Sequence, residues 1–133
     1  MIAPIKLTIP DDPRYHGVAR LVVGGLAARL ELSYEHLEDL QLALASVLEN
    51  DGYTVGPEVN VELMIDEGSL DLRIGPLNGE TLRVDLERES ETEIGLGRLL
   101  RTVVETVELE ERPDGQWLRL EKRLKSVKTE TTQ

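Results

Sequence analysis

Two polar residues near the middle of the chain, Ser46 and Asn50, have a spacing that would let them act together on a helix. Residues four positions apart lie on the same helical face, so the Ser46 hydroxyl and the Asn50 carboxamide are expected side by side. A serine hydroxyl has a pKa far above neutrality and cannot accept a proton as a carboxylate does. Glu49 is expected to point about 100° away from Asn50 around the helix. The pair therefore offers a hydroxyl and an amide oxygen, but no general base.

These side chains depend on an amphipathic helix within residues 33–53. Ser33 is placed to cap its start, and Gly52 follows the last periodic residue as a natural stop. The apolar stripe expected to face the core consists of Leu37, Leu40, Leu44, Val47 and Leu48. Asp39 joins Ser46 and Asn50 on the opposite face. The helix is therefore expected to pack on the core and to present a polar back.

The segment before this helix predicts a strand and a first helix. Residues 3–9 alternate apolar and polar side chains, and Asp12 before Pro13 forms a favourable helix start. Residues 14–30 follow with helical spacing, and Arg20 and Arg29 are expected to face solvent. The apolar positions of that helix are Val18, Leu21, Val22, Leu26 and Leu30.

The segment after it predicts an antiparallel hairpin over residues 58–75, with its turn at residues 66–68. Gly75 to Gly79 is expected to be a loop. Residues 82–86 alternate briefly and suggest either a short edge strand or an irregular crossing. Residues 87–93 read as an exposed charged segment.

The last part of the chain predicts a helix over residues 94–106, followed by strands at 107–111 and 117–124. Together these elements predict an α+β, two-layer sandwich with a mixed, mostly antiparallel sheet covered on one face by three helices. We expect residues 1–124 to form one domain and residues 125–133 to form a polar C-terminal tail.

Composition excludes several classes of function. The 133 residues have a formal net charge of −11, which opposes binding to nucleic acid or to anionic membranes. The absence of cysteine rules out disulfides and thiolate chemistry, and the sequence shows neither a signal peptide nor an apolar run long enough to span a bilayer. These features predict a cytoplasmic protein.

Searches for familiar catalytic motifs find none. His16 and His36 are too few for a metal cluster and are expected to lie at the surface or near helix caps. The chain contains no phosphate-binding loop with a Gly-Lys ending, no nucleophile elbow and no Rossmann glycine pattern. Spacings such as Glu35 with Asp39 carry little weight in so acidic a chain.

Four stretches carry a family resemblance: LTIPDDP, the helix around Arg20, LQLALASVLEN, and GLGRLLRTVVETVELEE. With the hairpin between them, they resemble the anti-sigma-factor serine kinases, small bacterial members of the histidine-kinase-like ATPase (GHKL) superfamily. The similarity extends to about Leu124 and rests on element order and spacing more than on identities. It implies the histidine-kinase-like ATPase fold.

The resemblance implies a nucleotide site with three signatures, of which the first is Glu-x-x-x-Asn on a helix. There the Glu acts as general base and the Asn helps to hold Mg²⁺, whereas this chain has Ser46 and Asn50. The second signature is Asp-x-Gly-x-Gly after a strand, whose Asp accepts a hydrogen bond from adenine. Here Gly75 to Gly79 follows Ile74 without a carboxylate at the expected place.

The third signature is a Gly-x-Gly before a helix, where backbone amides meet phosphates, and Gly95-Leu96-Gly97 stands at that position. A tight helix start explains these glycines equally well. The lid between the second and third signatures is reduced to residues 80–94, which are dominated by charge. If a nucleotide site is retained, the resemblance assigns Asn50, Gly95 and Gly97 to the nucleotide and Asn50 to the metal.

The sequence therefore favours a regulatory protein-interaction module that resembles an anti-sigma factor, has a degenerate nucleotide site and needs no cofactor. Its partner would be a sigma factor or an anti-sigma antagonist, bound in part by Arg20, and the resemblance makes a homodimer plausible. An active ATP-dependent protein serine kinase using ATP and Mg²⁺ is the alternative, with Asp51 or Glu49 moved into the place of the base. A structural or dimerisation domain without ligand is a third reading.

Overall fold

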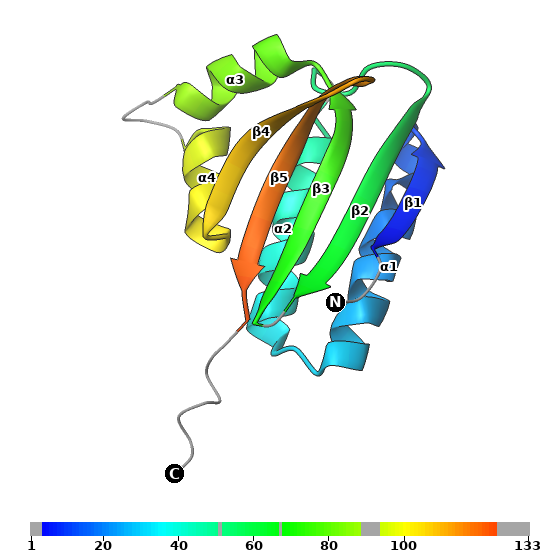
Figure 1. Ribbon diagram of the computed structural model, residues 1–133, viewed down its shortest axis with the longest axis vertical. Coiled ribbons are helices and arrows are strands. Elements are labelled where there is room, and N and C mark those ends of the chain that lie inside the picture. Colours follow the sequence, from blue (N-terminus) through cyan, green and yellow to red (C-terminus); the bar gives the residue numbers. More distant parts are fainter. Residues whose placement is uncertain (1–3, 51, 67, 89–93, 125–133) are drawn as a thin grey trace.

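The computed structural model describes residues 4–50, 52–66, 68–88 and 94–124. The expectations for Asp51, for residues 89–93 and for the tail at 125–133 fall outside the described residues. Figure 1 shows a sheet with helices packed behind it and beside it. The strands are β1 (Ile5–Pro10), β2 (Glu58–Asp66), β3 (Ser69–Leu77), β4 (Thr106–Arg112) and β5 (Gly115–Arg123). The helices are α1 (Pro13–Leu30), α2 (Tyr34–Leu48), α3 (Gly79–Glu87) and α4 (Leu96–Val103).

The five strands form one sheet in the order β1-β2-β3-β5-β4. Each neighbouring pair is antiparallel, so the strands do not form the mixed sheet of the prediction. The predicted hairpin is confirmed by the pairing of β2 with β3, in which Asp66 lies opposite Ser69. The α+β class with helices on one face of the sheet is confirmed, although the described residues contain four helices instead of three.

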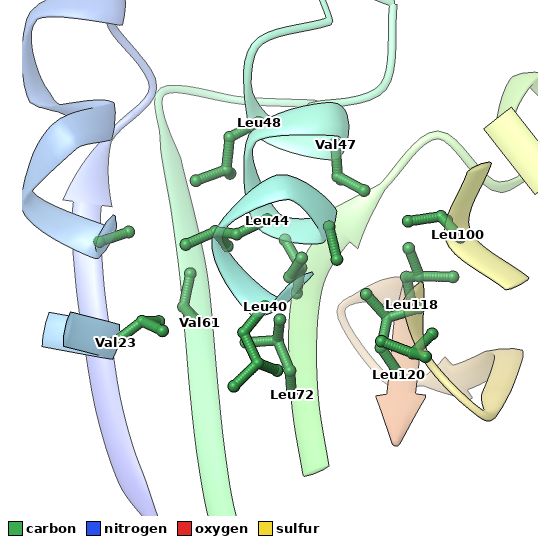
Figure 2. Close-up of a cluster of buried hydrophobic side chains, with 14 of the residues drawn as sticks. Val23, Leu40, Leu44, Val47, Leu48, Val61, Leu72, Leu100, Leu118 and Leu120 are labelled. Carbon is green, nitrogen blue, oxygen red and sulfur yellow. The ribbon is translucent and has the colours of Figure 1, made fainter. Parts of the chain in front are cut away.

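The core lies between α2 and the sheet. Leu40, Leu44 and Val47 of α2 are buried, and Figure 2 shows their side chains among those of Leu72 and Leu118 from the strands. Ser33 caps the helix, because its side chain accepts a hydrogen bond from the backbone amide of His36 at 3.0 Å. The predicted apolar stripe of this helix is therefore confirmed.

The opposite face of the sheet carries charged side chains in place of a second core. Arg112 bonds Glu62 of β2 and Glu110 of its own strand, and Arg73 of β3 lies 3.5 Å from Glu110. Cross-strand pairs of opposite charge stabilise a solvated sheet face modestly. This polar face agrees with a two-layer fold in which the helices cover only one side.

Helix α1 packs only in part through the predicted stripe: Val22, Leu26 and Leu30 are partly buried against the core, as predicted. Its buried residues are His16, Ala19, Val23 and Ala27, whereas Leu21 is 75% exposed. The sequence of α1 contains two overlapping stripes of apolar residues at helical spacing. The prediction chose the stripe with the larger and more hydrophobic side chains. Small residues on the other stripe allow a closer approach of the helix to the sheet, so Ala19 and Ala27 are the residues buried.

The segment after β3 forms a helix where a loop and a short strand or crossing were predicted. Asn78 caps α3, because its side chain accepts a hydrogen bond from the backbone amide of Thr81 at 3.2 Å. Leu82 and Leu86 are buried, and their spacing of four residues fits a helical face. The prediction was wrong because five residues of apolar alternation also contain this helical pair.

Lys122 of β5 is a buried cation that the sequence did not single out. The residue is 7% exposed, and Nζ lies 3.0 Å from Asp39 Oδ2 and 2.9 Å from the carbonyl oxygen of Val103. A buried ammonium group needs such partners to offset its lost hydration. The contact joins α2 and the C-terminal end of α4 to the sheet.

Replacing this lysine by methionine should lower the free energy of unfolding by about 1–3 kcal/mol, because a buried carbonyl and a carboxylate lose their donor. Urea unfolding of Lys122→Met measures the change. Arg123→Met is the matched control, since Arg123 is the next residue of β5 and is exposed. An equal loss of stability in both variants would contradict the role assigned to Lys122.

Candidate functional site

Ser46 lies in the last turn of α2, whereas Asn50 follows the helix, which ends at Leu48, so the two residues do not share one helical face as predicted. Both side chains make local hydrogen bonds. The Ser46 hydroxyl donates to the carbonyl oxygen of Leu42 at 2.7 Å. The Asn50 side-chain oxygen accepts from the backbone amide of Gly52 at 3.2 Å. Both groups therefore serve the helix end and the turn that follows it.

Arg20 and Glu49 form an ion pair that links α1 to this same helix end. Arg20 was predicted to face solvent, and its side chain is 41% exposed while it pairs with Glu49. A second contact fixes the two helices nearby, because the side-chain nitrogen of Gln41 donates to the carbonyl oxygen of Arg20 at 3.2 Å. The only carboxylate next to Asn50 that the structure describes therefore faces a guanidinium group, and Arg20 remains partly accessible at the surface.

Gly75 of β3 and Gly79 at the start of α3 make room for side chains of β5. A Cβ on Gly75 would lie 2.3 Å from the ring of Trp117, and one on Gly79 would lie 2.4 Å from Gln116 Cγ. Trp117 is 3% exposed, its indole nitrogen donates to Asp114 at 2.9 Å, and Arg112 lies over its ring. These two glycines are therefore explained by close packing within the chain.

Tyr53 is a buried residue that links the turn after α2 to α3. Its side chain is buried, with 2% of the residue exposed, and its hydroxyl donates to Asp85 Oδ2 at 2.6 Å. Its carbonyl oxygen accepts from the backbone amide of Asn78 at 2.7 Å. Burial, and then the hydrogen bond to Asp85, raise the pKa of the Tyr53 hydroxyl above its ordinary value. Sequence reasoning missed this residue, and only its apolar ring beside a helix end could have pointed to it.

The N-terminus of α4 rests against the C-terminal end of α3. A Cβ on Gly97 would lie 2.1 Å from the carbonyl oxygen of Leu86, and one on Gly95 would lie 3.2 Å from that of Arg88. The Arg101 side chain also donates to the Leu86 oxygen at 3.4 Å. The partial positive charge of this helix end therefore meets carbonyl oxygens of the same chain. The two glycines permit this approach.

A polar cluster of His16, Asp11 and Thr54 lies where β1 ends. His16 was predicted at the surface or near a helix cap, and it lies in the first turn of α1, where it is buried. Its Nε2 lies 3.3 Å from Asp11, which also accepts a hydrogen bond from Thr54 at 2.5 Å. The group joins the start of α1 to the loop before β2. Among the residues that the structure describes, no three His, Cys, Asp or Glu side chains gather to hold a metal ion.

Comparison with known proteins identifies the family of this chain. No family model matches the sequence. A serine-protein kinase RsbW from Halalkalibacterium halodurans is 32% identical over 127 residues, which cover 80% of this chain and 75% of that protein. The chain belongs to the RsbW family of serine-protein kinases. The RsbW of Listeria monocytogenes serotype 4a is 36% identical over 91 residues, which cover 64% of this chain and 57% of that protein.

A solved structure has the same fold as this chain. The RsbU and RsbW domains of Rv1364c from Mycobacterium tuberculosis match with a TM-score of 0.65 and 15% identity, over 92% of this chain and 32% of that one. At this identity the match establishes the fold. The predicted resemblance to anti-sigma serine kinases is confirmed at the level of the RsbW family. In the described part of the chain, no helix is long and apolar enough to cross a membrane.

The packing of Gly97 in this RsbW relative predicts a large effect of a single methyl group. Gly97→Ala should lower the free energy of unfolding by about 1–3 kcal/mol, because a backbone oxygen blocks the new Cβ. Gly25→Ala is the matched control, since Gly25 is also helical and nothing lies within 4 Å of its added Cβ. That control should raise the stability by up to about 1 kcal/mol. Thermal unfolding of both variants measures the difference, and a Gly97→Ala protein as stable as wild type would contradict the packing role.

The raised pKa of Tyr53 predicts a loss of stability at alkaline pH. An unfolded tyrosine has a pKa of about 10. Because the folded state holds the proton more tightly, the Tyr53 hydroxyl contributes fully to the free energy of unfolding below about pH 10. This contribution falls as the pH rises above that value. Urea unfolding should show wild type more stable than Tyr53→Phe by about 1–2 kcal/mol at neutral pH. This difference should shrink at about pH 11, and a constant difference would count against the assignment.

Proposed function

We propose that this chain is a protein-interaction module of the anti-sigma type that works without binding or turning over nucleotide. One observation carries the proposal: the positions that correspond to nucleotide contacts by resemblance are engaged by partners within the chain. Trp117 lies against Gly75 of β3, and Gln116 lies against Gly79 at the start of α3. The carbonyl oxygens of Leu86 and Arg88 lie against Gly97 and Gly95. Tyr53 links the turn after α2 to α3.

The residues present do not fit Mg²⁺-ATP. Serine stands at the position of the general base, and the Asn50 oxygen expected at the metal accepts a backbone hydrogen bond. The adenine acceptor is absent from the sequence after Ile74, and a buried amino group without an acceptor would cost about 1–3 kcal/mol. The carbonyl oxygens of Leu86 and Arg88, which lie beside Gly97 and Gly95, would repel a phosphate group. This misfit supports a module whose cofactor has been lost.

Binding to a protein partner is the function that membership of the RsbW family supports for this chain. We infer a sigma factor or an anti-sigma antagonist as the partner, in line with the resemblance, and a site that includes Arg20. The guanidinium group of Arg20 is partly exposed and held at the α1–α2 surface by Glu49. The net charge of −11 supports a partner whose docking face is basic.

An active kinase is the second candidate, because the relatives are named serine-protein kinases. Phosphoryl transfer would need ATP, Mg²⁺ and a group that positions or deprotonates the acceptor hydroxyl. Glu49 could serve only after leaving Arg20, and Asp51 lies outside the described residues. The second candidate therefore requires a rearranged end of α2.

Calorimetric titration with Mg²⁺-ATP and Mg²⁺-ADP should give no binding heat at ligand concentrations up to about 1 mM, which corresponds to a binding free energy of about −4 kcal/mol. The RsbW of Halalkalibacterium halodurans serves as the comparison protein in the same buffer. Micromolar binding by the present chain would overturn the proposal. In that case, transfer of labelled phosphate to a partner protein, and its loss in Asn50→Ala, would establish the kinase.

A further inference from the structure

The excess negative charge of the protein lies in one third of its sequence. Residues 30–72 contain 11 Asp and Glu residues and no Lys or Arg, whereas the other 90 residues contain 15 acidic and 15 basic residues. The formal charge of −11 therefore belongs entirely to this segment, which includes α2, β2 and the start of β3. A partner with a basic docking face is attracted most strongly to the surfaces that this segment forms.

The carboxylates of α2 differ from those of the strands in having no basic partner. On the open face of the sheet, Glu62 of β2 pairs with Arg112 of β4. Glu35 and Glu38 of α2 are exposed, and within the described residues neither forms an ion pair with a Lys or Arg. Helix α2 therefore presents negative charge that no neighbouring cation offsets.

Exposed apolar side chains lie among these carboxylates. Tyr34 is 72% exposed and Leu42 is 46% exposed. They stand four residues before and four residues after Glu38, so the three side chains follow one side of α2. Large apolar side chains that gather in an exposed row are typical of a surface that binds a partner.

Helix α1 extends this apolar row. The side-chain nitrogen of Gln41 donates to the carbonyl oxygen of Arg20 at 3.2 Å, and Leu21 and Leu42 are the residues that follow this bonded pair. Both leucines are exposed, and Figure 1 shows their helices side by side behind the sheet. Leu21 and Leu42 therefore flank the contact between α1 and α2. The acidic α1–α2 surface consists of Leu21, Tyr34, Glu35, Glu38 and Leu42.

We propose that the acidic α1–α2 surface docks a basic amphipathic helix of a protein partner. The apolar face of that helix covers the exposed apolar residues, and its Lys or Arg side chains pair with Glu35 and Glu38. Apolar residues spaced at three and four positions on a partner helix can follow the row along α2. The inference rests on the proposed function and deepens it, because it names the chemistry of the partner and extends the site beyond Arg20.

Charge argues against the other possible occupants of this surface. A second copy related by twofold symmetry would place Glu35 and Glu38 against identical carboxylates. Nucleic acids and anionic membranes carry negative charge and are repelled as well. A neutral apolar segment would bury the two carboxylates without a cation, which is costly. A basic amphipathic segment satisfies both the apolar and the charged groups.

The test uses two labelled synthetic peptides of leucine and lysine, each about five helical turns long. One has its leucines at intervals of three and four residues, and the other has the same composition with the leucines spread around the helix. Fluorescence anisotropy with the full chain should show about tenfold tighter binding of the first peptide, because only that peptide buries a row of apolar side chains. This binding should weaken as the salt concentration rises.

One pair of variants tests the apolar part of the surface. Leu42→Ser should weaken binding of the amphipathic peptide about tenfold, because the leucine loses its contact with the peptide. Val84→Ser is the matched control, since Val84 lies on α3 and is 53% exposed. The control should bind as wild type does. Both positions are exposed, so urea unfolding should find both variants close to wild type in stability.

A second pair of variants tests the charged part. Glu35→Gln combined with Glu38→Gln should weaken binding about fivefold, because two ion pairs with the peptide are lost. Glu80→Gln combined with Glu87→Gln is the matched control, since it removes the same charge from exposed positions of α3. The control should keep an affinity close to that of wild type.

The proposal fails if wild type binds neither peptide or binds both equally, or if each control variant loses as much affinity as its counterpart. It also fails if sedimentation equilibrium shows self-association that Leu42→Ser abolishes, since a second copy would then be the occupant. Calorimetry with Mg²⁺-ATP measures nucleotide binding independently of either peptide. The failure of the docking surface and the failure of the nucleotide-free function are therefore distinguishable.

Discussion

The packing of α2 on the sheet is the interaction on which the rest of the structure depends. Leu40, Leu44 and Val47 lie in the buried interface that Figure 2 shows, and the core is aliphatic because the chain has no Phe. Burial of each such side chain stabilises the fold by roughly 1.5–3 kcal/mol before the entropy of ordering is subtracted. Since α2 is held by one face, its C-terminal end and its polar back stay in a constant position relative to β3 and α3.

This placement of α2 brings the turn that follows it against α3. Tyr53, in the turn after α2, donates a hydrogen bond to Asp85 of α3. Trp117 and Gln116 of β5 lie against Gly75 and Gly79. Such contacts are made once, during folding, and cost no translational entropy of a free ligand. An intramolecular occupant therefore competes strongly with a dissolved one. The fold of the RsbW family is kept in this chain, and these contacts support the proposal that it works without nucleotide.

Local periodicity predicted the elements whose patterns allow one interpretation. The stripe of α2 and the alternation of β2 and β3 are long enough to exclude the other period, and both predictions were confirmed. Helix α1 was placed correctly, but Leu21 was assigned to the core in place of Ala19. Helix α3 was missed because a short alternating run is ambiguous. In both cases the contacts of the element with its neighbours decided the outcome.

The candidate site was likewise predictable from the sequence only in part. The sequence by itself determined that serine stands four residues before Asn50 and that no carboxylate follows Ile74 at the expected place, because these facts concern which groups exist along the chain. Only the tertiary structure decided that Tyr53 bonds Asp85 and that Gly75 and Gly97 face protein atoms. Those contacts join residues from separate elements, and their geometry follows from how helices and strands pack, which no local pattern encodes.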